Sequence, residues 1–193
     1  MPSRICIIQG HPDPDGGHFG HALAEAYADA AMAAGHDVSR IEIAELNLPC
    51  LRSRGEWLEG APDAAIVTAQ ERIRDADHLV ILFPLWLGDM PALLKAFLEQ
   101  VMRPGFALPA GAAKLNAGLL KGRSARIIVT MGMPAPVYRW FFGGYAVRLL
   151  RRNILQFVGI RPVRTSIIGM VEGSARHRAR WLKKVRQLGH AAR

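Results

Sequence analysis

Apolar runs of strand length alternate with amphipathic segments along the chain. The runs RICIIQ (residues 4–9), HLVILF (78–83) and ARIIVTM (125–131) are mostly apolar, which is typical of strands covered on both faces. DVSRIEI (37–43) and VRTSIIG (163–169) predict two further strands, and the first of these alternates more clearly. The pattern therefore predicts five strands separated by other elements.

The segments between the strands have the periodicity of helices. Apolar residues at helical spacing predict helices over residues 19–34, 64–75, 91–102 and most of 137–158, and a basic helix that closes the chain. The long connection between the second strand and the helix at 64–75 carries no predicted element.

Strands that alternate with helices favour a parallel sheet, because each parallel connection needs a crossover. The expected fold is α/β, a flavodoxin-like doubly wound sheet of five parallel strands in the order 2-1-3-4-5, with helices on both faces. No repeat or linker interrupts it, so residues 1–193 are expected to form a single flavodoxin-like domain. Such folds bind ligands at the carboxyl ends of the strands. That rule selects three loops, over residues 10–20, 84–90 and 130–138.

Composition places the chain among cytoplasmic proteins. With 193 residues and 50% hydrophobic content it can bury one substantial core, and its apolar runs are shorter than the roughly 20 residues a spanning helix needs. The first residues lack the longer apolar stretch of a secretory signal. Cys6 and Cys50 have no metal-ligand spacing, so neither a disulfide framework nor a metal site is expected.

The formal charge of +9 brings nucleic acid or an anionic membrane surface into consideration. Much of the excess lies in the closing segment ARHRARWLKKVRQLGHAAR, where Leu182, Val185 and Leu188 stand at helical spacing. The simpler interpretation is an amphipathic helix with a solvated cationic face. A nucleic-acid-binding domain has only charge in its favour, since no reading helix or stacking motif is present.

The first loop, GHPDPDGGHFGH, leads into a helix N-terminus, where backbone amides and the helix dipole favour an anion. It matches neither G-x-G-x-x-G nor G-x-x-x-x-G-K-[ST], which excludes a P-loop nucleotide hydrolase. Asp13 and Asp15 are interpreted as turn or capping residues. His11 and His18 either donate to phosphate oxygens or are ordinary polar loop residues.

The second and third loops suit a flat apolar ring. Residues 85–87 (Leu-Trp-Leu) follow a buried strand and either form a platform for a ring or fill a core or subunit interface. The third loop, TMGMPAPVY, places Thr130, the amides near Gly132 and Tyr138 on the same rim. One loop suited to phosphate and two suited to a ring together describe a flavin site.

These motifs carry a resemblance. GHPDPDGGHFGHALAEA, FPLWLGDMPALLKAFLEQV, PGFAL, TMGMPAPVY and NILQFVGI are similar to segments of the NAD(P)H:quinone oxidoreductase family of flavodoxin-like flavoproteins, and the likeness covers nearly the whole chain. The most specific element is F-P-L, four variable residues and then MPALLK.

The resemblance implies a set of flavin contacts and a catalytic tyrosine. It places His11 and Phe19 against the phosphate-bearing chain, residues after strand three along the ring, and residues after strand four on the ring's other side, with Tyr138 as the catalytic candidate. The full cofactor-binding set is His11, His18, Phe19, Gly20, Pro84, Leu85, Trp86, Leu87, Gly88, Thr130, Met131, Gly132 and Met133.

The chain departs from the family pattern at several positions. His18 and Gly20 flank Phe19 where the family usually has Ser or Thr and then Asn, which leaves the choice of FMN or FAD open. Gly144 replaces the histidine that partners the tyrosine in animal enzymes. Leu108 and Ala110 stand where tyrosines shape the substrate pocket, so a more apolar pocket is expected.

The resemblance implies an NAD(P)H-dependent flavin oxidoreductase that reduces quinones or similar electrophilic aromatics by two-electron hydride transfer. The alternative is a flavin-binding regulatory subunit that docks on a membrane transport system of the potassium-efflux type. A homodimer is also implied, with Trp140, Phe141, Phe142 and Tyr145 serving either its interface or the core. The acceptor and the preference for NADH or NADPH stay open.

Overall fold

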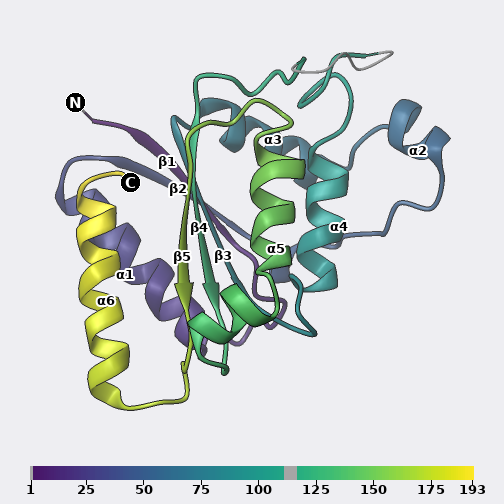
Figure 1. Cartoon of the computed structure of the whole chain (residues 1–193). Coiled ribbons are helices and arrows are strands. Elements are labelled where there is room, and N and C mark those ends of the chain that lie inside the picture. The colour runs from purple at the N-terminus through teal and green to yellow at the C-terminus, as the bar shows by residue number, and fades with distance from the viewer. Residues whose placement is uncertain (1, 111–116) are drawn as a thin grey trace.

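The protein, described by a computed structural model over residues 2–110 and 117–193, is built on one parallel five-stranded sheet (Figure 1). The strand order is β2-β1-β3-β4-β5, and every neighbouring pair is parallel. The predicted fold class and strand order are therefore confirmed. The strands are β1 (Arg4–Gln9), β2 (Asp37–Glu42), β3 (His78–Pro84), β4 (Ser124–Thr130) and β5 (Val163–Ile168).

Helices cover both faces of the sheet. In Figure 1, α1 and α6 lie on one side, and α3, α4 and α5 lie on the other. The helices are α1 (Phe19–Ala33), α2 (Arg54–Glu59), α3 (Ala64–Asp75), α4 (Ala92–Val101), α5 (Tyr145–Arg148) and α6 (Ala175–His190), with a 3₁₀ turn η1 (Ile43–Glu45). The predicted helices α1, α3 and α4 are confirmed to within one or two residues, and the basic helix expected to close the chain is α6.

The connection between β2 and α3 contains the short helix α2, which the sequence prediction missed. Its side chains are not buried, so it has no apolar stripe to reveal it. Its start nevertheless has a capping signature: Ser53 Oγ accepts from Glu56 N at 3.0 Å, and Glu56 Oε2 accepts from Arg52 N at 2.9 Å.

The segment predicted to be largely helical over residues 137–158 is helical, but much of it is π-helix rather than α-helix. It forms η2 (Val137–Phe141), α5 and η3 (Leu149–Leu155), and bonds such as Phe142 N to Val137 O at 3.1 Å span five residues. The break after η2 falls at Gly143 and Gly144, which have φ of 67° and 60°. Left-handed backbone of this kind is cheap only for glycine.

The two faces of the sheet bury separate apolar clusters. Ile5, Ile7, Val80 and Leu82 pack toward α1 and α6, while their neighbours in sequence pack toward α3, α4 and the α5–η3 segment. Period-two alternation of the side chains explains this division. The basic helix α6 is amphipathic as predicted, with Val185 buried and most of its basic residues exposed. No helix within the described residues is both long and apolar enough to cross a membrane.

A buried histidine at the start of β3 predicts acid-sensitive stability. His78 is 4% exposed, its Nδ1 lies 2.7 Å from Ser124 Oγ, and burial followed by the charges of Arg126 and Arg164 lowers its pKa to about 4. An unfolded histidine titrates near ~6.5, so the unfolded chain takes up the proton first. The stability contributed by neutral His78 is therefore complete above that value and is lost as pH falls toward 4.

We expect wild-type protein to lose about 2 kcal/mol of unfolding free energy through this group between pH 7.5 and pH 5. Urea unfolding at the two pH values measures it. In His78→Gln the pH-dependent loss should shrink by that amount, whereas His190→Gln, at an exposed position on α6, should keep it. Equal losses in wild type and His78→Gln would mean that another group is responsible.

Candidate functional site

Three loops converge at the carboxyl ends of the strands, at the lower edge of the sheet in Figure 1. They follow β1, β3 and β4, as predicted from the strand order. The backbone holds them close together: Gly10 N donates to Leu82 O at 2.6 Å, and Leu85 N donates to Thr130 O at 2.8 Å. A Cβ on Gly10 would lie 2.7 Å from Leu82 O, so the first loop approaches β3 as closely as backbone allows.

Three histidines form a cluster in the first loop and the first turn of α1. The rings of His11 and His18 are stacked with centroids 4.0 Å apart, and His21 lies 5.2 Å from His11. His18 Nε2 lies 2.7 Å from Asp13 Oδ2. The sequence prediction named His11 and His18 but missed His21, whose spacing of three residues from His18 on a helix was the available signal.

His11 has a defined tautomer in its neutral form. Asp13 N donates to His11 Nδ1 at 3.1 Å, so the ring proton resides on Nε2, which is then a donor. Burial, with the charges of His18 and His21 next, lowers the pKa of His11; burial and His18 likewise lower the pKa of His21. Asp13 keeps a lowered pKa because it accepts from Asp15 N and from His18, so it is a turn residue as predicted.

Unpartnered donors surround this cluster. Gln9 is 1% exposed, its Oε1 accepts from His11 N, and its buried Nε2 has no partner among the described residues; nor does the buried His21 Nδ1. His18 stands at the N-cap of α1 but makes no side-chain capping hydrogen bond; its carbonyl accepts from His21 N, and no side-chain cap covers the amides of Phe19 and Gly20. Buried polar groups of this kind are normally paired. An anionic group with several acceptor oxygens fits this loop.

The second loop forms an exposed apolar shelf, which we define as Trp86 and Leu87. Trp86 is 49% exposed and Leu87 is fully exposed. A tight turn presents them: Trp86 N donates to Asp89 O, Asp89 N donates to Trp86 O, both at 2.9 Å, and Leu87 and Gly88 have φ of 48° and 83°. Left-handed backbone is strained for leucine, and such strain clusters at functional sites. The core alternative considered for these residues is wrong for Trp86 and Leu87.

Leu87→Gly tests whether this strain is maintained for a ligand. Glycine adopts positive φ without penalty, so we expect the variant to unfold with about 1 kcal/mol more free energy than wild type. The same change should weaken binding of any ring that packs on the shelf. Urea unfolding of the ligand-free protein measures the first effect. Leu119→Gly, at another exposed leucine without positive φ, is the control and should lose stability or stay unchanged.

The shelf and the histidine cluster touch. The rings of His11 and Trp86 lie 5.8 Å apart in an edge-to-face arrangement. The predicted phosphate loop and the predicted ring platform therefore form one continuous surface.

Backbone hydrogen bonds fix the third loop to the end of β5 and the residues that follow it. Met131 N donates to Ile168 O at 2.9 Å, and Met133 O accepts from Met170 N at 3.2 Å. A Cβ on Gly169 would come within 2.4 Å of Ala135 N, so only glycine permits this contact. Thr130 and Met131 are buried, whereas Gly132 is exposed and open to a ligand. Gly169 is a positioning residue that the sequence prediction missed.

Tyr138 is enclosed rather than placed on the open rim. It is 1% exposed, and its hydroxyl accepts from Val147 N at 3.4 Å. Burial raises its pKa, with hydrogen bonds from the backbone of Val147 and Ala146 acting in the opposite direction. The sequence predicted Tyr138 on the rim of this edge; in the structure its side chain is buried there, because η2 turns the ring inward against α5.

The other predicted site residues divide between the surface and the core. Gly20 lies in the first turn of α1, but Phe19 packs partly buried against the α1–α6 cluster, away from the loop surface. Pro84 ends β3, and Leu85 packs partly buried against the other cluster.

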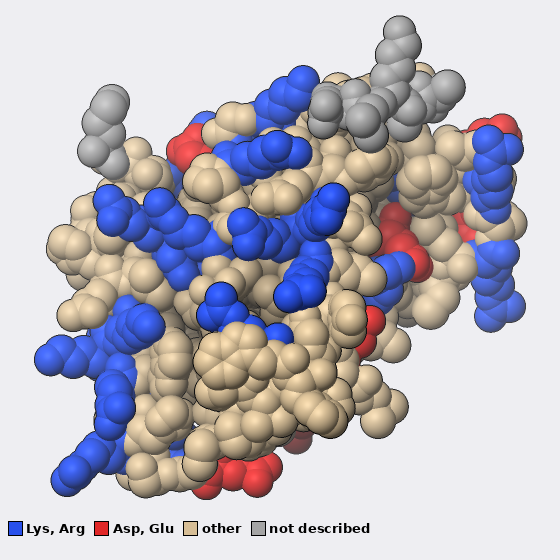
Figure 2. All heavy atoms as spheres, viewed as in Figure 1, with Lys and Arg blue, Asp and Glu red and all other residues tan. Residues whose placement is uncertain are grey.

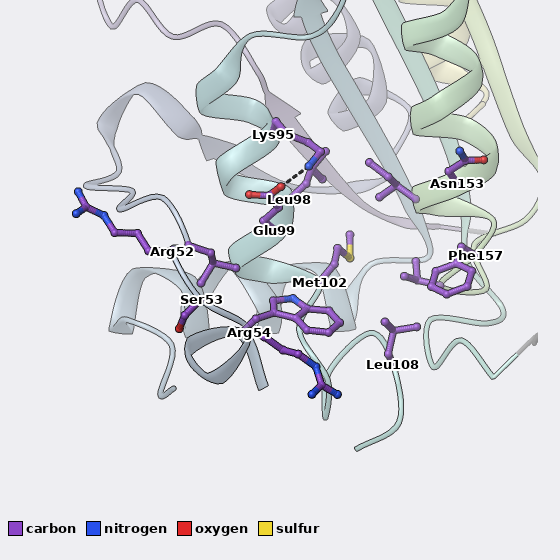
Figure 3. Close-up of a pocket in the computed structure, with 14 residues that line it drawn as sticks. Arg52, Ser53, Arg54, Lys95, Leu98, Glu99, Met102, Leu108, Asn153 and Phe157 are labelled. Atoms are coloured by element: carbon purple, nitrogen blue, oxygen red, sulfur yellow. Dashed lines mark hydrogen bonds and ion pairs between the residues drawn. The ribbon is translucent and has the colours of Figure 1, made fainter. Parts of the chain in front are cut away.

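A cavity of about 580 Å³ lies elsewhere, between α2, α4 and the end of η3 (Figure 3). Met102, Leu108 and Phe157 line it, together with the indole of Trp57. In Figure 3 the Lys95–Glu99 ion pair lies along its α4 wall, and Arg52 extends away from it. Of the two residues expected to shape the substrate pocket, Leu108 lines this cavity, whereas Ala110 is exposed and is not among its lining residues.

The chemistry of the loop surface is not that of a metal centre. Among residues 2–110 and 117–193, no group of three His, Cys, Asp or Glu is placed to hold a metal ion. Two of the clustered histidines are stacked face to face, with their planes 17° apart, rather than converging on a point.

Comparison with known proteins agrees with this architecture. A family model described as a flavodoxin-like fold matches residues 3–189. An uncharacterized NAD(P)H oxidoreductase of Haemophilus influenzae is 27% identical over 168 residues, or 84% of this chain and 82% of that protein. NAD(P)H dehydrogenase (quinone) 1 of Rattus norvegicus is 24% identical over 189 residues, covering 86% and 68%.

A solved structure, the NAD(P)H:quinone oxidoreductase from Methanothermobacter marburgensis, superposes with a TM-score of 0.80 at 22% identity, over 100% of this chain and 98% of that one. The extent of the family match, the sheet order and the loops at its carboxyl edge all agree, and this chain belongs to the flavodoxin-like fold family.

Proposed function

We propose that the protein is an NAD(P)H-dependent flavin oxidoreductase that reduces quinones or related electrophilic aromatics. One observation carries the proposal: at the carboxyl edge of the sheet an exposed apolar shelf touches a histidine cluster, and the buried Gln9 Nε2 and His21 Nδ1 beside this cluster have no partner among the described residues. A ligand that combines a flat ring with a phosphate-bearing chain suits both parts. The names of the rat and archaeal relatives, a quinone dehydrogenase and a quinone oxidoreductase, support the same activity.

The flavin's phosphate would lie at the start of α1. There, Gln9 Nε2, neutral His11 and the first-turn amides of α1 are donors, and the helix dipole adds attraction for an anion. His18 replaces the hydroxyl donors that the family usually has at this position.

The ring would pack on Trp86 and Leu87, with the loop after β4 along its other side. When bound, the flavin accepts a hydride from NAD(P)H and passes two electrons to the acceptor. The residues bind, orient and exclude water: Trp86 and Leu87 supply apolar surface, and the backbone near Gly132 is open to a polar ring edge. Tyr138 holds the third loop's helical extension through Val147 N, which makes it a positioning residue in this conformation.

FMN and FAD remain alternatives. A relative from Nitratidesulfovibrio vulgaris, 24% identical over 182 residues, is named an FMN-dependent NADH:quinone oxidoreductase, which favours FMN. The cytoplasmic setting expected from the sequence is compatible with soluble nicotinamide donors. Neither the relatives nor the site favours the transporter-subunit alternative.

The first experiment loads the purified protein with FMN or FAD, desalts it and records the visible spectrum, followed by anaerobic addition of NADPH and NADH. We expect a retained flavin spectrum that bleaches with one or both donors and returns when a quinone is added. Loss of all flavin on desalting would contradict the cofactor assignment. A retained flavin that no donor bleaches would contradict the reductase activity while leaving the binding site intact.

A homodimer is part of the proposal. The face around the cavity of Figure 3 combines apolar side chains with charges of both signs, Arg54 and Glu99 among them, as a two-fold interface requires for self-complementarity. Light scattering at working concentration decides it: a monomer at all accessible concentrations would contradict the dimer.

A further inference from the structure

Acidic residues are missing from a long part of the sequence. Residues 100–171 contain nine arginines and two lysines but no aspartate or glutamate. Figure 2, in the orientation of Figure 1, shows Lys and Arg gathered over the face that carries α5, with few Asp or Glu among them. The segment that contains α5 therefore contributes cations that no acidic residue of the same segment offsets.

Large aromatic side chains stand exposed on the same segment. Trp140, Phe141 and Tyr145 are 77%, 82% and 71% exposed, and Phe142 is 49% exposed. The rings of Phe141 and Phe142 lie edge to face, with centroids 5.0 Å apart. The core role considered for these residues is therefore wrong, because all four side chains are exposed.

Arginines border these aromatic residues on the adjoining helix. Arg148, Arg151 and Arg152 are exposed, whereas Val147 and Leu150 are buried against the sheet. The α5–η3 segment is thus anchored by one side and presents its cations on the other. We define the aromatic–arginine patch as Arg139, Trp140, Phe141, Phe142, Tyr145, Arg148, Arg151 and Arg152.

We infer that the aromatic–arginine patch docks the protein on an anionic lipid bilayer surface. Tryptophan, tyrosine and phenylalanine favour the boundary between headgroups and acyl chains, where a ring is partly buried. Arginines around them neutralise lipid phosphates, and each arginine within a Debye length of the surface makes the free energy of membrane binding more favourable. The patch supplies both the aromatic rings that enter this boundary and the cations that attract lipid phosphates. The docking does not depend on the redox reaction proposed above.

Charge argues against a second copy of the chain at this patch. A two-fold contact centred on the patch would bring the four arginines of each protomer, eight in all, into one interface. The segment has no acidic residue to pair with them, so the contact would be repulsive. Glu99 and Glu172 are the nearest acidic residues before and after the patch along the chain, and both lie outside it.

Vesicle sedimentation tests the docking. We expect wild-type protein to sediment with vesicles of phosphatidylcholine and phosphatidylglycerol, not with phosphatidylcholine alone, and to be released by salt. Arg151→Glu with Arg152→Glu should lower the partition coefficient by about thirtyfold or more. Trp140→Ser with Phe141→Ser should lower it by at least about tenfold. Circular dichroism and thermal unfolding confirm that each variant is folded.

The matched control is Arg176→Glu with Arg180→Glu, which makes the same charge change at exposed positions of α6. It should reduce binding far less than the patch variant. Equal losses in the two charge variants, or absence of wild-type binding to anionic vesicles, would overturn the proposal. So would a change of oligomeric state in the aromatic variant, which would assign the patch to a second copy, or tighter wild-type binding to duplex DNA than to vesicles at the same salt.

Discussion

Replacing Trp86 and Leu87 together by aspartate is expected to abolish flavin retention. The two side chains form the exposed shelf beside the histidine cluster, so the change removes two apolar surfaces and places two anions near the proposed phosphate site. Losing about 3–5 kcal/mol of apolar contact raises the dissociation constant by at least a hundredfold. Fluorescence titration with FMN and FAD measures this loss, and activity should fall with flavin content.

The folded state should tolerate the double replacement, because Leu87 is fully exposed and Trp86 is about half exposed in the ligand-free protein. Its unfolding free energy should therefore remain within about 1 kcal/mol of wild type. Met32→Asp with Val67→Asp is the matched control, since it introduces the same charges at exposed apolar positions on α1 and α3. A folded Trp86/Leu87 variant that binds flavin as tightly as this control would show that the flavin site lies elsewhere.

Gly189→Ala is expected to destabilise the protein by about 2 kcal/mol or more. Gly189 lies near the end of α6, where the helix packs against α1, and a Cβ there would come within 2.2 Å of Tyr27 O. The obstacle is backbone, so the two helices must move apart to accommodate a methyl group. Because α1 carries the proposed phosphate site at its other end, flavin binding should weaken as well.

Gly55→Ala provides the comparison for this change. Gly55 is also helical, but the nearest atom to its would-be Cβ is Ser53 Oγ at 3.9 Å. Alanine favours helix over glycine by about 1 kcal/mol, so this variant should be as stable as wild type or slightly more so. Urea unfolding of both variants decides the point. A Gly189→Ala protein as stable as Gly55→Ala would mean that the α1–α6 contact is looser than the structure shows.

The candidate site could be predicted in outline because its parts follow strand ends. Buried parallel strands appear as apolar runs, and a strand order with a switch point between β1 and β3 identifies the loops that meet there. This reasoning selected His11, His18, Trp86 and Leu87, which the structure brings into one surface.

Residues that depend on a neighbour far away in sequence were not predictable in the same way. Gln9 belongs to an apolar run and becomes notable only because its buried Nε2 has no partner among the residues that the structure describes. Gly169 and Gly189 are ordinary glycines in the sequence, and their roles come from backbone that approaches from another element. Tyr138 was expected on the rim, but the turn of η2 against α5 encloses it.

The sequence by itself determined the class of fold, the order of the strands and the three loops that meet, because these follow from local periodicity and from the need for crossover connections. Only the tertiary structure decided which side chains are covered. The aromatic residues from Trp140 to Tyr145 have the composition of a core yet stand in solvent, whereas His78 and Gln9 are polar yet buried. Whether a side chain is buried depends on which residues from elsewhere in the chain pack against it. The residues next to it in the sequence do not determine those contacts.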